Sequence, residues 1–218
     1  MTQCKAIQQS DEMFCAACGL RWDVNDMFPP ECRPTTKRMV IGITGPAGAG
    51  KSTLAAYMSI AYGFERLDMA LPLKMMLWEL IEHYGPGDAD RWVFGDKKDS
   101  PCPVLGHQSP RYAMQTLGTE WGRDCISTDL WVNTARNQIA ATTSNVVIEN
   151  IRFDNEAALC DRIIRITDRG GIEGEHSSEN GVRRWDVSYS NVGTVCDMHA
   201  WFDYVAPLLE VRANTSRP

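Results

Sequence analysis

The sequence has no run of apolar residues close to the roughly 20 that a membrane-spanning helix needs. Its opening stretch, Met-Thr-Gln-Cys-Lys-Ala-Ile-Gln-Gln-Ser, has no apolar core of a signal peptide. Internal repeats and low-complexity runs are also missing. We therefore expect a protein that stays in the cytoplasm and has no membrane partner.

The composition has no extreme value that would mark an unusual class of protein. Apolar residues make up 44% and charged residues 23% of the chain, which excludes disorder, collagen and coiled coil. The 218 residues are enough for one α/β domain with a full core and a small appendage.

The chain has more acidic than basic residues, with a formal net charge of −6. Residues 1–38 hold five basic and five acidic side chains, so residues 39–218 carry the whole excess. Tight binding to long DNA needs a basic surface, and DNA binding is therefore not expected. A local basic site for a small phosphorylated ligand remains compatible with this charge.

Four of the eight cysteines fall in the first 32 residues. Cys15 and Cys18 form a C-x-x-C-G knuckle, Cys32 follows, and Cys4 is the best candidate for a fourth ligand. In a cytosolic chain this pattern predicts a structural zinc site, and residues 1–38 are predicted to be a separate Cys-rich unit. The alternative is an unmetallated tail with reduced thiols. The other four cysteines are expected to be free structural thiols.

From residue 39 onward, apolar strand-like runs alternate with helical patterns. The strands are predicted at residues 39–43, 64–67, 145–149, 162–166 and 187–190. The helices are predicted at residues 51–62, 71–84, 110–125, 128–142, 155–161 and 194–212. This alternation predicts an α/β fold with a mostly parallel central sheet and helices on both faces. Residues 85–109 are predicted to be a long loop, either a mobile functional excursion or an ill-ordered insert.

The strongest motif is Gly-Pro-Ala-Gly-Ala-Gly-Lys-Ser at residues 45–52, which matches the phosphate loop G-x-x-x-x-G-K-[ST]. Its backbone N–H groups can surround the phosphates of ATP, Lys51 can bridge the terminal phosphates, and the Ser52 hydroxyl can hold Mg²⁺. The predicted nucleotide-binding residues are Gly45, Gly48, Ala49, Gly50, Lys51, Ser52 and Thr53. The motif predicts a P-loop NTPase fold, but it does not separate kinase, ATPase and GTPase.

Arginines in three segments are candidates to clamp the transferred phosphate. On a helix, Arg111 and Gln115 would share a face, with a phosphate on Arg111 and a base edge on Gln115. Arg152 and Arg169 each follow a predicted strand, where ligands bind in open α/β sheets. Glu149 ends such a strand and is predicted to help hold the magnesium. The alternative is that these arginines are solvated ion-pair partners.

Several segments resemble, in order and spacing, the motifs of the phage-type deoxynucleoside monophosphate kinases. They are residues 72–74, 109–120, 151–157, 176–179 and 190–194, and the most specific is Arg-x-x-x-Gln-x-Leu-Gly-Thr at residues 111–119. The resemblance spans about residues 39–212 and implies a nucleoside-monophosphate-kinase-like fold over residues 39–218. It implies transfer of the γ-phosphoryl group of ATP to a deoxynucleoside monophosphate, in the host cytoplasm if the chain is of phage origin.

The resemblance also implies roles for individual residues. Substrate binding would fall to Lys74, Arg111, Gln115, Arg152 and Glu156. Taken with the phosphate-loop motif and the arginines of residues 168–184, this predicts catalytic roles for Lys51, Arg111, Arg152 and Arg169, with Arg183 or Arg184 as alternatives to Arg169 for closing over the phosphate. The chain departs from the family at Asn150, which follows Glu149 where the family often has an acidic pair, and at Leu71, where Asp is common.

Two other functions stay open at this point. One is a kinase that acts on a modified base within DNA, with residues 1–38 gripping the strand. The other is a non-enzymatic, ATP-dependent module that docks a partner through the same residues. The sequence also leaves the oligomeric state open, a homodimer included.

Overall fold

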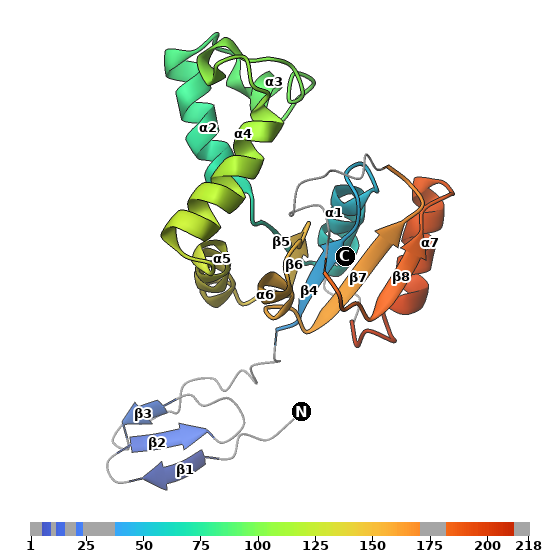
Figure 1. Cartoon of the computed structure of the whole chain (residues 1–218). Coiled ribbons are helices and arrows are strands. Elements are labelled where there is room, and N and C mark those ends of the chain that lie inside the picture. Colours follow the sequence, from blue (N-terminus) through green and yellow to red (C-terminus); the bar gives the residue numbers. More distant parts are fainter. Residues whose placement is uncertain (1–5, 10–11, 16–20, 24–37, 171–181, 212–218) are drawn as a thin grey trace. The chain divides into compact units, whose positions relative to one another are not determined.

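A five-stranded sheet forms the centre of residues 39–218 (Figure 1). Its strands are β4 (Val40–Thr44), β5 (Glu65–Asp68), β6 (Val146–Glu149), β7 (Arg162–Thr167) and β8 (Val187–Ser190). The order is β5-β6-β4-β7-β8, and every neighbouring pair is parallel. All residues of β4 and β6 are buried, as expected for strands of a parallel sheet that is covered on both faces. The predicted α/β architecture is confirmed.

The computed structural model describes residues 6–9, 12–15, 21–23, 38–170 and 182–211. The chain divides into two compact units, residues 1–38 and 39–218. The first unit contains an antiparallel sheet of β1 (Ala6–Gln9), β2 (Glu12–Cys15) and β3 (Arg21–Asp23), in that order. Cys15 ends β2, whereas the other predicted zinc ligands, Cys4, Cys18 and Cys32, lie outside the described residues.

Helices cover both faces of the central sheet. On one face, α1 (Lys51–Tyr62) and α7 (Val195–Val205) pack Leu54, Met58 and Phe202 against the strands, and all three side chains are fully buried. On the other face, the core contains residues of α5 (Leu130–Ala141) and α6 (Asp154–Ala157) and extends to α2 (Leu71–Tyr84) and α4 (Pro110–Thr116), which project beyond the sheet in Figure 1. Two separate apolar cores therefore fix the sheet between its helices.

The segment predicted as a long loop, residues 85–109, carries structure of its own. It contains α3 (Ala89–Val93) and a 3-10 turn, η1 (Pro103–Leu105). Trp92, Val93 and Cys102 are buried in the same core as α2. The prediction of an ill-ordered insert is wrong, because five helical residues are too few for a visible period in the sequence, yet they bury a tryptophan.

The helix predicted at residues 110–125 begins as α4 and continues as a π-helix, η2 (Leu117–Ile126). Trp131 packs closely on this segment, and its indole Nε1 donates to the carbonyl of Gly118 at 2.8 Å. A side chain at Gly122 would overlap the same indole ring. Such π segments often occur at functional sites.

Two other helices are shorter than predicted. The helix expected at residues 155–161 is only α6, because the chain returns at Asp161, whose N–H donates to the carbonyl of Val40 at 2.8 Å. The helix expected to reach residue 212 ends as α7 at Val205. Ala206 still has helical φ and ψ of −52° and −45°, but Pro207 has no N–H with which to continue the helical hydrogen bonds.

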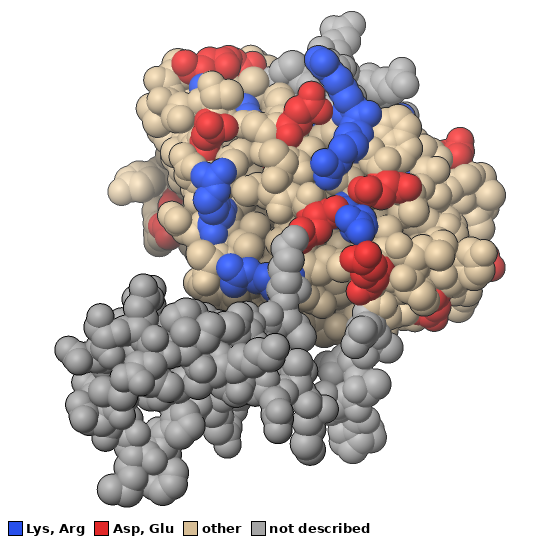
Figure 2. Space-filling view, turned by 90° about the horizontal axis from the view of Figure 1, so that it is seen from below, with Lys and Arg blue, Asp and Glu red and all other residues tan. Residues whose placement is uncertain are grey.

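The surface of the described residues mixes both signs of charge. Figure 2 shows one face on which Lys and Arg side chains form separate groups with Asp and Glu between them. Of the four described cysteines outside the N-terminal unit, Cys102 and Cys160 are buried and Cys125 and Cys196 are exposed, and all four are free. Within the described part of the chain, no helix is long and apolar enough to cross a membrane.

Candidate active site

Residues 45–52, called the phosphate loop after their sequence motif, lie where β4 ends and α1 begins, as the motif predicted. Gly45, Gly48 and Gly50 all have positive φ angles, of 142°, 77° and 101°. At Gly45 a side chain would also collide with the carbonyl oxygen of Ile166, so only glycine fits there. The Lys51 Nζ donates to the carbonyl oxygens of Gly45 and Pro46, each at 2.7 Å, and so lies across its own loop.

Two residues that follow other strands of the sheet contact this loop. Gly170, just after β7, has a φ of 75° and lies so close to Ala47 that a Cβ would overlap its carbonyl oxygen. Asn191, just after β8, is 1% exposed and donates from Nδ2 to the carbonyl of Ala49 at 2.7 Å. Its Oδ1 is buried without a hydrogen-bond partner among the described residues. The loop conformation therefore depends on the neighbouring strand ends.

A cavity of about 350 Å³ opens beside the loop, at the carboxyl ends of β4, β5 and β6. It is the place where ligands bind in open α/β sheets. Nine of the residues singled out in the sequence line it: Gly48, Lys51, Ser52, Lys74, Arg111, Gln115, Glu149, Arg152 and Glu156. The tertiary structure thus brings together the phosphate loop, the helix α4 and the segment after β6.

Charged pairs on adjacent strand ends form the floor of the cavity. Asp68, the last residue of β5, is aligned with Glu149, the last residue of β6. Asp68 accepts from the Lys74 Nζ at 2.5 Å, and Glu149 accepts from the Arg66 Nε at 2.5 Å. Lys74 is therefore ion-paired with Asp68. Glu149 is ion-paired with Arg66, which is not part of the cavity lining.

On α4, Arg111 and Gln115 both reach the cavity, as the predicted helical spacing requires. Arg111 forms a bidentate ion pair with Asp99: its Nε donates to Oδ1, and its Nη2 donates to Oδ2 at 3.0 Å. This pair lowers the pKa of the Asp99 carboxyl below its usual value. The guanidinium is consequently fixed in direction by the segment between α3 and α4.

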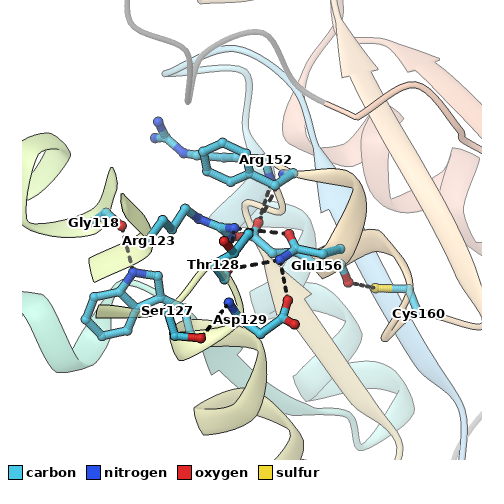
Figure 3. A network of polar contacts seen from close by, with 11 residues as sticks. Gly118, Arg123, Ser127, Thr128, Asp129, Arg152, Glu156 and Cys160 are labelled. Carbon is cyan, nitrogen blue, oxygen red and sulfur yellow. Dashed lines mark hydrogen bonds and ion pairs between the residues drawn. The ribbon is translucent and has the colours of Figure 1, made fainter. Parts of the chain in front are cut away.

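A buried ion pair forms the wall between α6 and η2 (Figure 3). Arg123 and Glu156 have side chains only 5% and 7% exposed, and the Arg123 Nη2 lies 2.5 Å from Glu156 Oε1. The other Glu156 oxygen accepts from the backbone N–H of Arg152 at 2.7 Å. Arg123 also donates to the carbonyl of Thr128 at 3.0 Å and lies 3.8 Å above the ring centroid of Phe153.

This wall bears on the role predicted for Glu156. Both of its oxygens accept hydrogen bonds from the protein itself, so in this geometry the carboxylate builds the wall. The side chain of Arg152, by contrast, extends away from the buried pair in Figure 3 and lines the cavity. Substrate recognition by Glu156 stays a prediction.

Some of the expected site residues do not line the cavity. Gly45, Ala49, Gly50 and Thr53 belong to the loop but not to the lining. Arg169 is exposed, and its Nη2 donates to the carbonyl of Gly193 at 3.1 Å.

The alternative closing arginines also lie apart from the cavity lining. Arg183 lies 3.5 Å from a carboxylate oxygen of Asp154, and Arg184 donates to the carbonyl of Cys160 at 3.2 Å. His176, in the family-like segment 176–179, lies outside the described residues.

Other lining residues were not predicted as site residues from the sequence. They are mainly Asp68, Lys98, Arg123 and Trp131. The position of Asp68 at a strand end could have revealed it, in the way that Glu149 was found. Lys98 gave no such signal, because it lies in the segment that looked like a loop. Among the described residues, no group of three or more His, Cys, Asp or Glu side chains could hold a metal ion.

No known protein family's sequence profile matches this chain. The chain is 28% identical over 189 residues to a putative deoxynucleotide monophosphate kinase of Acanthamoeba polyphaga mimivirus, a match that covers 74% of this chain and 93% of the relative. It is 43% identical over 56 residues to a cytidylate kinase of Solibacter usitatus, which covers 25% of this chain and 24% of that one. The chain is similar in sequence to nucleotide kinases.

Two solved structures were also compared. A protein from Thermus thermophilus aligns with a TM-score of 0.45 and 18% identity, over 78% of this chain and 98% of that one. A sugar kinase from Janibacter sp. HTCC2649 aligns with a TM-score of 0.38 and 11% identity, over 80% and 95%.

Proposed function

We propose that the protein is a nucleoside monophosphate kinase that transfers the γ-phosphoryl group of ATP to a deoxynucleoside 5′-monophosphate. The observation that carries the proposal is the charge of the cavity. The cavity lining contains six cationic side chains and three carboxylates, whereas the chain as a whole has a net charge of −6. A cationic cavity beside a phosphate loop suits two phosphorylated ligands that react with each other.

The proposal gives each side of the cavity a task. ATP would bind along residues 45–53, with its terminal phosphates near Lys51. The monophosphate would bind on the opposite side, near Arg111 and Arg152, with its base toward Gln115 and Trp131. The relatives' names support a nucleotide as the phosphate acceptor, since both name a kinase of a nucleotide. Positioning and charge stabilisation would supply most of the rate enhancement.

Magnesium would enter with ATP, neutralising the developing phosphate charge when bound. Ser52 and Glu149 both line the cavity, and Asp68 lies beside Glu149 on the neighbouring strand. Magnesium in such sites keeps several waters and takes only one or two protein oxygens besides the phosphates. This donor set therefore fits the ion.

The direct test is an ATP-dependent phosphorylation panel over all common ribo- and deoxyribonucleoside monophosphates, read by chromatography of the products. We expect diphosphate formation with at least one deoxynucleoside monophosphate, dependent on magnesium. ATP binding without transfer to any monophosphate would refute the kinase and favour a nucleotide-dependent interaction module. Transfer confined to bases within DNA would favour the DNA kinase, which the net charge of −6 does not favour.

Asn191 provides a prediction about the phosphate loop. Asn191→Ala removes the donor to the Ala49 carbonyl and leaves that buried oxygen unpaired, which typically destabilises a protein by about 1–3 kcal/mol. We expect KM for ATP to rise about tenfold, because the loop loses a fixed point. Val192→Ala, the adjacent and 78% exposed position, is the control and should leave KM for ATP unchanged. Equal KM values in both variants would contradict a role for Asn191 in holding the loop.

We further propose that Cys4, Cys15, Cys18 and Cys32 hold a structural zinc ion in residues 1–38. Metal analysis of the purified full chain is expected to give one zinc per molecule, released on treatment with a thiol-modifying reagent. Substitution Cys15→Ser should abolish the zinc, whereas Cys196→Ser, at an exposed free cysteine of the other unit, should not. Less than about 0.1 zinc per chain in protein purified without chelator would rule the site out.

A further inference from the structure

A third cation lies beside two of the ion pairs that line the cavity. Lys98 lines the cavity with Lys74 and Arg111, and the three come from different segments: α2, α4 and the stretch between α3 and η1. Lys74 is paired with Asp68, and Arg111 with Asp99. Among the described residues, no carboxylate forms an ion pair with Lys98.

The ammonium of Lys98 is in an environment that disfavours its charge. Burial lowers its pKa from the usual value, and the neighbouring charges of Lys74 and Arg111 lower it further, against the opposite effect of Asp68 and Asp99. A half-buried cation next to two others is unfavourable in isolation. A bound anion would remove that penalty, because it would attract all three cations at once.

The backbone around Lys98 is held in place. The Lys98 carbonyl accepts from the N–H of Arg111 at 3.0 Å, and the Lys97 N–H donates to the carbonyl of Arg91 at 3.0 Å. Asp99 forms the bidentate pair with Arg111. Lys98 is thus tied to the start of α4, so that its position relative to Arg111 is fixed before any ligand binds.

We propose that Lys98 binds the 5′-phosphate of the acceptor monophosphate together with Arg111, an inference that rests on the proposed kinase function. A phosphate monoester carries close to two negative charges at neutral pH. Lys98 would neutralise one of them, and Lys74 and Arg111, whose charges are only partly neutralised by Asp68 and Asp99, would attract the other. Within the segment 94–109, Lys98 is then the residue that binds the phosphate. A deoxynucleoside without its phosphate would gain nothing from it.

Three variants of the full chain test this assignment. Lys98→Met keeps the apolar stem of the side chain and removes the charge, and Lys98→Arg keeps the charge. Lys97→Met is the matched control, because Lys97 lies 4.7 Å from the ring centroid of Trp92 and is not part of the cavity lining. Binding of the four common deoxynucleoside monophosphates and of their parent deoxynucleosides is measured by calorimetry, and KM is measured for both substrates. Thermal unfolding checks that each variant is folded.

We expect Lys98→Met to raise Kd and KM for the monophosphate about 30-fold, the loss typical of a hydrogen bond to a charged group. KM for ATP and the weak binding of the deoxynucleosides should change by less than about twofold. Lys98→Arg should retain most of the affinity, and Lys97→Met should behave as the wild-type protein.

Two outcomes overturn the inference while the kinase function stands. One is an unchanged KM for the monophosphate in Lys98→Met, and the other is a rise in KM for ATP alone. A wild-type protein that neither binds nor phosphorylates any monophosphate overturns the kinase function, and the inference with it. The wild-type measurement therefore separates the two failures.

Discussion

Lys51→Ala is expected to lower kcat/KM for phosphoryl transfer by about 10³-fold, a loss of roughly 4 kcal/mol of transition-state stabilisation. In the structure the Lys51 ammonium lies over the phosphate loop, with the carbonyls of Gly45 and Pro46 as its acceptors. A nucleotide phosphate would be a stronger partner than these neutral oxygens, because it carries charge. The lysine can then follow the negative charge that moves during transfer, and alanine cannot.

The measurement is a steady-state assay of diphosphate formation with the best monophosphate of the panel. The melting temperature should stay close to that of the wild-type protein, because Lys51 is only half-buried. Lys97→Ala makes the same chemical change outside the cavity lining and should keep full activity. If Lys51→Ala retains kcat/KM within about threefold, the nucleotide does not bind at this loop as proposed.

Glu156→Ala is expected to destabilise the protein by about 3–5 kcal/mol, the usual consequence of breaking a buried ion pair. Both partners are almost fully buried, and removal of Glu156 leaves the guanidinium of Arg123 without its carboxylate in the wall of the cavity. The backbone N–H of Arg152 loses its acceptor as well. For a domain of this size, we expect the melting temperature to fall by about 10 °C.

The exposed pair of Arg91 and Asp96 is the matched control. Its Nη2 to Oδ2 distance is 2.7 Å, but the side chains are 51% and 68% exposed. Asp96→Asn should therefore leave the melting temperature unchanged within error, because solvent screens such pairs. In Glu156→Ala, a higher KM for the monophosphate at unchanged stability would instead assign Glu156 to substrate recognition.

The double variant Arg123→Met, Glu156→Met separates the charge effect from the packing effect. It removes both charges and keeps most of the side-chain volume, so it should recover part of the stability lost in Glu156→Ala. Recovery will be incomplete, because methionine accepts no strong hydrogen bond from the backbone of Arg152. No recovery at all would mean that the ion pair is not the source of the loss.

Much of the fold could be predicted from local patterns in the sequence. The strand at the phosphate loop, the helix after it and the five-stranded parallel sheet follow from short apolar runs that alternate with helical spacing. The placement of Arg111 and Gln115 toward one cavity follows from their spacing of four on a helix. These predictions succeeded because each depends on residues close together in the chain.

What the sequence alone determined is the place of the phosphate-loop motif between a strand and a helix, the parallel α/β sheet and the α4 residues that reach the cavity. Only the tertiary structure decided which charges meet. Lys98 lies beside Arg111 because a backbone hydrogen bond connects the two residues. The carboxylate of Glu156 is ion-paired because the chain folds so that Arg123, 33 residues before it in the sequence, lies next to it. The physical reason is that a charged side chain acts according to its burial and its partners. Both are set by packing between distant segments and not by the local pattern of residues.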